Sequence, residues 1–196
     1  MSTLNGVGGV AADPEGALEG GVGGCVRMDG GGSQLNAGQA ILPAGSGAIS
    51  LCLWMRATVA TTSALVSQYV APGTAGYEHR FGLRLVSGGG IGWWRAGVVK
   101  VQSSASLLDG KWHMVAAERQ STGVLRLWVD GVLVDEGSDS QPFVETETVL
   151  GAFPGVSSYE GWLDEVAVCP EALGETAIKS LWCWGCGLPQ LSGGAA

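Results

Sequence analysis

The sequence predicts an all-β fold of two antiparallel sheets packed face to face, and residues 109–136 carry most of this prediction. Residues 112–119 are rich in apolar and β-favouring types. In residues 124–129, leucine and valine alternate with arginine and tryptophan, the period-two pattern of a strand. Asp130-Gly131 then supplies two residues that tolerate positive φ, as a type I′ hairpin turn requires, before a strand at 132–135. A meander of this kind needs a second sheet to cover it.

Further strands are predicted from apolar runs that are bounded by turn signals. They lie at residues 25–29, 34–36, 48–57, 63–70, 79–86, 91–95, 147–153 and 161–168. The run at 48–57 is apolar on both faces, which is typical of a central strand. A short helix follows at 175–182, with Gly174 at the capping position. Together these elements predict a two-sheet antiparallel jelly-roll sandwich with one short C-terminal helix.

The chain divides most simply into one domain with two extensions. Its 196 residues suffice for a single core. Residues 25–182 form the predicted domain, residues 1–24 a Gly-rich N-terminal arm, and residues 183–196 a C-terminal tail. An isolated Gly-rich segment does not order itself, so we expect the arm to be held across its own sandwich or by a neighbouring subunit.

Four segments resemble one family in the expected order. "DGKWHMVA" followed by "LRLWVDG" resembles the central motif of laminin-G-like, concanavalin A-like jelly-roll domains. Residues 48–57 (AISLCLWMRA) are similar to an early core strand, and residues 159–173 (YEGWLDEVAVCPEAL) to the closing strand and its turn into the last helix. Residues 25–36 (CVRMDGGGSQLN) resemble the opening strand more loosely. The resemblance implies the fold, but this fold hosts lectins, adhesion modules, hydrolases and structural subunits.

Composition and charge exclude some partners. A net charge of −8 argues against binding a nucleic-acid backbone, which depends on Lys and Arg. Charged residues make up only 14% of the chain, against about 25% in ordinary domains. Either a core-rich domain with a Ser/Thr/Gly surface or a subunit with a covered surface explains this scarcity. No run reaches the roughly 18 apolar residues of a membrane span.

The N-terminus and the cysteines bear on the compartment. The first residues lack the basic start and apolar stretch of a secretory signal peptide. Five cysteines are an odd number for a disulfide framework, and Cys25, Cys52 and Cys169 fall inside predicted strands. We therefore expect a chain that is made in the cytoplasm, folds under reducing conditions and is incorporated into a virion or another large particle.

Catalysis is not expected. Glucanases of the resembled superfamily place carboxylates at alternate strand positions, as in Glu-x-Asp-x-Glu, and no such run occurs. Glu145 and Glu147 are only two acids, and Asp164 and Glu165 are adjacent, which places them on opposite faces of a strand. Neither His79 nor His113 has an acidic partner nearby in sequence, and the resemblance implies a structural role for His113.

Calcium is a possible cofactor that the resemblance implies. Many domains of this fold hold one structural Ca²⁺ between the opening and closing strands. The matching positions are Asp29 and Asp164, with Glu165 as a further candidate. Alternatively, both aspartates only cap turns and bind backbone amides.

Trp93 and Trp94 are the candidate binding residues. Adjacent strand residues point to opposite faces, so one indole faces the core and the other faces outward. The outward indole could stack on a sugar, anchor an interface, or lie under the protein's own loops.

The tail carries two further features. Cys183 and Cys186 form a Cys-x-x-Cys pair that could be packed thiols, a disulfide or half of a metal site. Leu181, Trp182 and Trp184 form an apolar patch, so Trp182 and Trp184 are candidate docking residues.

Two classes of function remain. The first is a non-enzymatic structural or interaction subunit of a large oligomeric assembly, such as a phage capsid decoration or appendage protein, docking through its arm and tail. The second is a calcium-dependent, lectin-like module for surface glycans. A glucanase-like hydrolase ranks third, because it needs a carboxylate pair that the sequence lacks.

Overall fold

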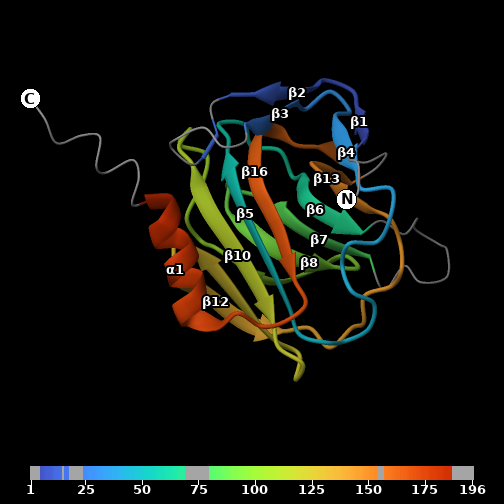
Figure 1. The fold of residues 1–196 in the computed structure, drawn as a ribbon, viewed down its shortest axis with the longest axis vertical. Coiled ribbons are helices and arrows are strands. Elements are labelled where there is room, and N and C mark those ends of the chain that lie inside the picture. The colour runs from blue at the N-terminus through green and yellow to red at the C-terminus, as the bar shows by residue number, and fades with distance from the viewer. Residues whose placement is uncertain (1–4, 15, 18–23, 69–79, 154–156, 187–196) are drawn as a thin grey trace, which may run out of the picture.

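The protein is a sandwich of two seven-stranded antiparallel sheets, with one helix on the outer face of one sheet (Figure 1). The structure is a computed structural model. It describes residues 5–14, 16–17, 24–68, 80–153 and 157–186. This architecture confirms the predicted jelly-roll class.

Each sheet draws its strands from distant parts of the chain. The first, sheet A, has the spatial order β1 (Asn5–Val7), β4 (Gln34–Asn36), β13 (Thr148–Leu150), β6 (Ala64–Gln68), β7 (Phe81–Leu85), β8 (Ile91–Arg95) and β9 (Val98–Gln102). The second, sheet B, has the order β12 (Val132–Ser138), β11 (Val124–Val129), β10 (His113–Arg119), β5 (Ile49–Arg56), β16 (Glu160–Cys169), β3 (Cys25–Asp29) and β2 (Val10–Asp13). A small hairpin pairs β14 (Ala152–Phe153) with β15 (Ser157–Ser158).

The described part of the N-terminal arm belongs to the sandwich of its own chain. β1 pairs with β4 in sheet A, and β2 pairs with β3 in sheet B. Residues 5–13 therefore pass from one sheet to the other. The ladder hydrogen bonds hold a Gly-rich segment whose side chains contribute little packing.

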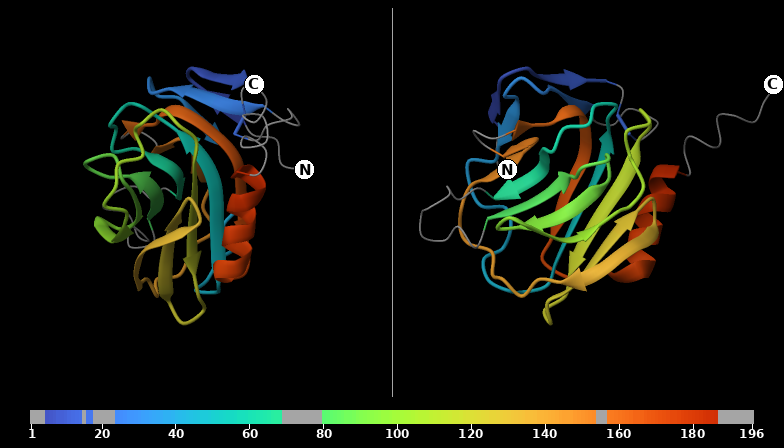
Figure 2. Two further views of the ribbon diagram at one scale, coloured as in Figure 1. Left: turned by 90° about the vertical axis from the view of Figure 1, so that its left-hand side faces the viewer. Right: turned by 180° about the vertical axis from the view of Figure 1, so that it is seen from behind.

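The main core lies between the sheets and is built from the inward residues of both. Leu51, Leu53 and Met55 of β5 face Phe81 and Leu83 of β7, and all five are buried. Figure 2 shows the green strands of sheet A on the side of the molecule away from α1.

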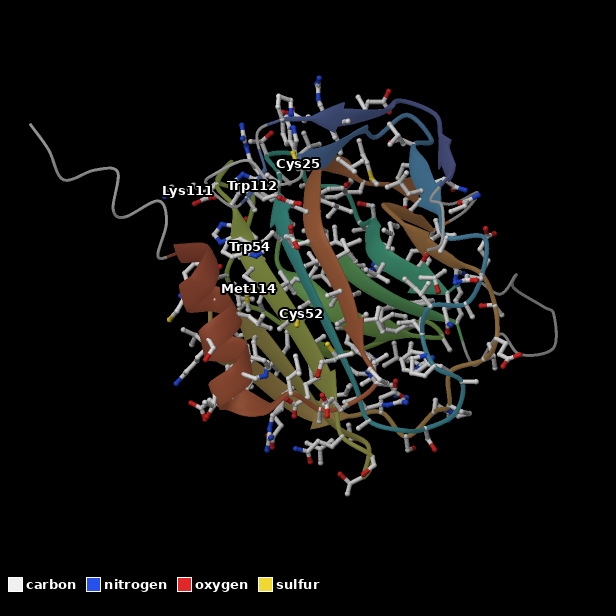
Figure 3. The ribbon with its side chains drawn as sticks, viewed as in Figure 1. Cys25, Cys52, Trp54, Lys111, Trp112 and Met114 are labelled. Atoms are coloured by element: carbon white, nitrogen blue, oxygen red, sulfur yellow. The ribbon has the colours of Figure 1, made fainter. Side chains whose placement is uncertain are left out.

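A second apolar cluster covers the outer face of sheet B. The helix α1 (Gly174–Cys186) packs here through Ile178, which is fully buried. Under the helix lie Trp54 and Met114, on the side of β5 and β10 that faces it (Figure 3). The buried Glu118 carboxylate accepts a hydrogen bond from the Gly174 amide and so fixes where the helix begins. This cover explains why β5 is apolar on both faces.

The helix does not span a membrane. α1 has 13 residues, and no helix in the described part of the chain is long and apolar enough to cross a bilayer.

Two backbone features decide local chain direction. Asp130 and Gly131 have φ of 51° and 74°, which confirms the predicted type I′ turn. The predicted strand 147–153 is divided into β13 and β14 at Gly151, whose φ is 78°. A Cβ atom at Gly151 would collide with the Met28 sulfur, so only glycine fits there.

A buried carboxylate joins the two sheets at one end of the sandwich. Asp139 follows β12, and its Oδ2 accepts hydrogen bonds of 2.9 Å from Trp93 Nε1 and from Arg95 Nε, both on β8. Asp139 and Arg95 are each 2% exposed, so the ion pair is shielded from solvent. A buried pair of this kind is satisfied only while both partners are present.

Phe143 extends this anchor to a second arginine. The guanidinium carbons of Arg95 and Arg119 lie 4.7 and 4.4 Å from the Phe143 ring centre. Arg119 also donates hydrogen bonds to the carbonyl oxygens of Gly45, Gly47 and Gln141. The loops around residues 45 and 143 are thereby tied to β10.

Some strands were not predicted. β9 follows a tight turn at Ala96-Gly97, and Ala96 takes a φ of 45°. An alanine in this conformation is uncommon, so the turn lacks the usual Asn-Gly or Asp-Gly signal. β1 and β2 lie in the Gly-rich arm, where the alternation that marks a strand is weak.

We predict that Asp139→Asn lowers the free energy of unfolding by about 3–5 kcal/mol, because it leaves the Arg95 charge buried without its counter-ion. Urea denaturation followed by tryptophan fluorescence measures the change. Glu136→Gln is the control, since it breaks only the exposed pair with Arg126 and should cost about 0–1 kcal/mol. Equal effects of the two substitutions would contradict the anchoring role of Asp139.

Candidate binding site

The two adjacent tryptophans occupy opposite faces of sheet A. Trp93 is fully buried in the main core, where it bonds to Asp139. Trp94 faces outward, but it is only 7% exposed, and its ring packs edge-on against Phe153 with 5.2 Å between ring centres. Trp94 is therefore covered by the protein's own residues and offers little open surface for stacking a sugar.

The two aspartates considered for calcium lie on neighbouring strands but far apart along them. Asp29 pairs with Glu160 across β3 and β16, whereas Asp164 lies four residues further along β16, which is about 13 Å in a strand. Asp29 accepts a hydrogen bond from the Gly31 amide. Both carboxylate oxygens of Asp164 accept hydrogen bonds from backbone amides, Oδ2 from Ala17 and Oδ1 from Glu165. These residues do not fit a shared calcium ion, and they bind backbone amides instead.

Glu165 does not complete a metal site either. It lies in a β-bulge of β16 with a φ of 46°. In the part of the chain that the structure describes, no group of three or more His, Cys, Asp or Glu side chains is placed to hold a metal ion.

His113 has two acidic partners, which sequence reasoning missed. Its Nδ1 lies 2.7 Å from Asp130 Oδ2, and its Nε2 lies 3.0 Å from Asp109 Oδ1. Only the imidazolium form carries a proton on both nitrogens and can donate both bonds. The hydrogen bond to Asp130 raises the pKa of His113 against the opposing effect of burial. Asp109 was close enough in sequence to be noticed, but Asp130 reaches His113 only through the hairpin. His79 lies outside the described residues.

An open hollow of about 470 Å³, here called the rim pocket, lies between loop 38–44, which follows β4, and loop 145–147, which precedes β13. Its volume is within the range of small-molecule sites. Gly45 and Phe143 form an isolated β-bridge with two 2.9 Å hydrogen bonds, which joins the two loops. Thr148 also holds the loop 38–44. Its hydroxyl oxygen accepts a hydrogen bond from the Ile41 amide, and its own amide donates a hydrogen bond to the Gln39 carbonyl oxygen. The walls of the rim pocket are thus fixed by the sandwich.

The rim pocket is acidic. Glu145 and Glu147 line it, and both are exposed, whereas none of its lining residues is Lys, Arg or His. Glu147 accepts a 3.2 Å hydrogen bond from the Gly38 amide, so its carboxylate is held in place. Leu42 and Pro43 add an apolar part to the wall. Such a surface accepts hydrogen bonds from hydroxyl groups or a cation and repels an anion.

Comparison with known proteins identifies the family. Residues 29–179 match the sequence profile of the concanavalin A-like lectin/glucanases superfamily. The chain belongs to this superfamily. A comparison with curated protein sequences gave no significant match.

Solved structures share the fold of this superfamily member. Domain 4 of AbnA, an extracellular arabinanase from Geobacillus stearothermophilus solved in complex with arabinotriose, is similar with a TM-score of 0.74 and 18% identity, over 91% of this chain and 86% of that one. The binding domain of Paraclostridial Mosquitocidal Protein 1 (TM-score 0.69, 12% identity) and that of botulinum neurotoxin serotype G (0.68, 13%) each match 92% of this chain. The chain spans about half the length of these two toxin domains, 47% and 46%.

The described strands of sheet A lack the carboxylates of a glucanase. None of the seven described strands of the sheet contains Asp or Glu. The two glutamates of the rim pocket lie in a loop before β13 and not at alternate positions of a strand. A pair of carboxylates across one sheet face, as glycoside hydrolysis requires, is therefore not formed by these strands.

The C-terminal helix uses Trp182 within the chain. Trp182 stacks on Trp54 with 5.4 Å between ring centres and an angle of 25° between the ring planes. Trp182 thus packs on its own sheet, whereas Leu181 is exposed. The side chains of Trp184 and Cys186 lie outside the described residues, and Cys183 is an exposed free thiol.

We predict that His113 makes stability pH-dependent in a specific direction. Its pKa is raised in the folded state, so its stabilising effect is fully present below about pH 6.5 and is lost as the pH rises through the folded pKa. The melting temperature of the wild type should exceed that of His113→Gln most at about pH 6 and progressively less toward pH 9. A constant difference across this range would show that the imidazolium form does not contribute.

Proposed function

We propose that this protein is a non-catalytic glycan-binding module and that the rim pocket is its binding site. The observation that carries the proposal is an acidic hollow whose lining, among the described residues, includes no Lys, Arg or His. Sugars present many hydroxyl donors, and fixed carboxylate and carbonyl oxygens are strong acceptors for them. Arabinotriose in the AbnA domain supports a sugar ligand, because that domain matches this chain over most of both lengths.

The proposed site needs no calcium. Asp29 and Asp164 accept hydrogen bonds from backbone amides, and neither residue lines the rim pocket. This differs from the calcium-dependent module that the sequence suggested, since the rim pocket offers its own acceptor groups. We expect glycan binding to persist in EDTA.

We predict that Glu145→Ala weakens binding of a neutral oligosaccharide at least about tenfold, because a hydrogen bond to a charged group contributes about 1.5–3 kcal/mol. Isothermal titration calorimetry against arabinotriose and a panel of neutral oligosaccharides measures the affinity. Glu175→Ala is the matched control, because Glu175 is exposed on α1 over the opposite sheet. Equal affinities of the two variants, or no binding by any sugar of the panel, would contradict the proposal.

Exposed apolar residues on an edge strand favour protein binding as a second candidate function. Val132, Leu133 and Val134 begin β12, the last strand of sheet B, and are 62%, 42% and 39% exposed. Unpaired edge strands of this kind recruit another strand. We propose a second copy of this chain as the partner, since a two-fold axis at Leu133 would align Val132 with Val134 of the other copy. Membership of a virion or another large particle stays a prediction.

We predict that Val132→Lys shifts the protein toward the monomer, because it places like charges on both sides of the two-fold axis. Sedimentation velocity over a range of concentrations measures the association. Val59→Lys, in an exposed loop residue outside the described strands, is the control and should leave it unchanged. A wild type that remains monomeric at every concentration would remove this candidate.

A further inference from the structure

The charged residues in the described strands of sheet A are all basic. The charged residues in its seven described strands are Arg84, Arg95 and Lys100, and Arg80 directly precedes β7. This is unexpected in a chain with 18 acidic and 10 basic residues. Arg95 is explained by its ion pair with Asp139 in the core. Arg84 needs a separate explanation.

Arg80 and Arg84 lie on the same outer face of sheet A, on either side of Gly82. Trp94 is the cross-strand neighbour of Gly82, and the Phe153 ring lies where a Cβ atom of Gly82 would be. The guanidinium carbons of Arg80 and Arg84 lie 5.1 and 5.7 Å from the Trp94 ring centre. Two cations thus flank one buried aromatic pair, with no acidic residue in the strands beneath.

Arg84 has no hydrogen-bond acceptor or ion-pair partner in the described part of the chain, unlike Arg95 and Arg119. Its Nε is shielded from solvent without a hydrogen-bond acceptor, and no carboxylate in the described part of the chain pairs with its guanidinium. Arg119, in contrast, donates to three backbone carbonyls. Burial and the neighbouring charge of Arg80 lower the pKa of Arg84. A half-buried, unpaired guanidinium is costly, because it has lost water without gaining an acceptor.

We propose that Arg84, supported by Arg80 on the Trp94–Phe153 pair, binds an oxyanion, such as the carboxylate of an acidic sugar, on the outer face of sheet A. A guanidinium matches the two oxygens of a carboxylate or sulfate with parallel hydrogen bonds. The bound oxyanion would accept hydrogen bonds from the terminal guanidinium nitrogens and so supply the counter-charge that Arg84 lacks among the described residues. This site differs from the rim pocket in position and in the sign of the charge it selects, so the two proposals fail independently.

Calorimetry that compares trigalacturonate with its methyl ester tests the site, because methyl esterification removes the charge of the sugar carboxylates and changes little else. The wild type should bind trigalacturonate at least about tenfold more tightly than its methyl ester, since a charge-assisted hydrogen bond is lost. Inorganic sulfate distinguishes the source of the oxyanion. If sulfate binds as tightly as trigalacturonate and displaces it, the site recognises the anion alone. If sulfate binds more weakly than trigalacturonate, the sugar contributes to binding as well.

Arg84→Met is the informative variant, because it removes the charge and keeps an apolar chain over Trp94. We expect it to abolish the preference for trigalacturonate over its ester, and to melt at or above the wild-type temperature without ligand. Arg27→Met is the matched control, since Arg27 also lies over an indole, Trp162, but on sheet B. It should bind trigalacturonate as the wild type does.

Three results would overturn the proposal. The first is that the wild type binds no oxyanion. The second is that Arg84→Met binds trigalacturonate as tightly as the wild type does. The third is that anions bind to the Glu78→Gln variant but not to the wild type. Glu78 is the one acidic residue among residues 69–79. Binding only after its removal would identify Glu78 as the partner of Arg84.

Discussion

The buried Asp139 carboxylate is the constraint on which the candidate binding site depends. It fixes Trp93 and Arg95 of β8, and Arg95 and Arg119 in turn enclose Phe143. The loop that carries Phe143 continues into residues 145–147, and its β-bridge with Gly45 positions the loop 38–44. A charge that is costly to bury alone therefore helps to tie these two loops to the sandwich. Rigid walls favour binding, because little conformational entropy remains to be lost.

Charge is distributed so that the two proposed sites select opposite ligands. Acidic side chains line the rim pocket, whereas the charged side chains in the described strands of sheet A are all basic. In a chain with few charges, local fields are set by these small groups more than by the net charge. The rim pocket could thus hold a neutral sugar while Arg84 binds an acidic group, whether the two groups belong to one ligand or to two. Neither proposed site requires catalytic carboxylates.

Local structure could be predicted from the sequence, and contacts between distant segments could not. The Asp130-Gly131 hairpin, the doubly apolar β5 and the final helix follow from short-range patterns. Asp139 gave no signal, because it lies in a polar stretch and acts on β8, over 40 residues away. The Asp29–Asp164 hypothesis identified neighbouring strands, but strand register separates the two side chains. Trp94 faces outward as alternation allows, yet Phe153 covers it from a hairpin that alternation does not place.

The central claim is that the rim pocket is the site at which this superfamily member contacts a neutral glycan. Amide chemical-shift mapping of isotope-labelled protein, titrated with the oligosaccharide that binds most tightly, tests it most directly. The account predicts that the perturbed amides cluster in residues 38–44 and 145–147, with little change in β12 or α1. Saturable shifts confined to sheet B or to α1 would contradict it, because they would place the ligand on the opposite side of the sandwich.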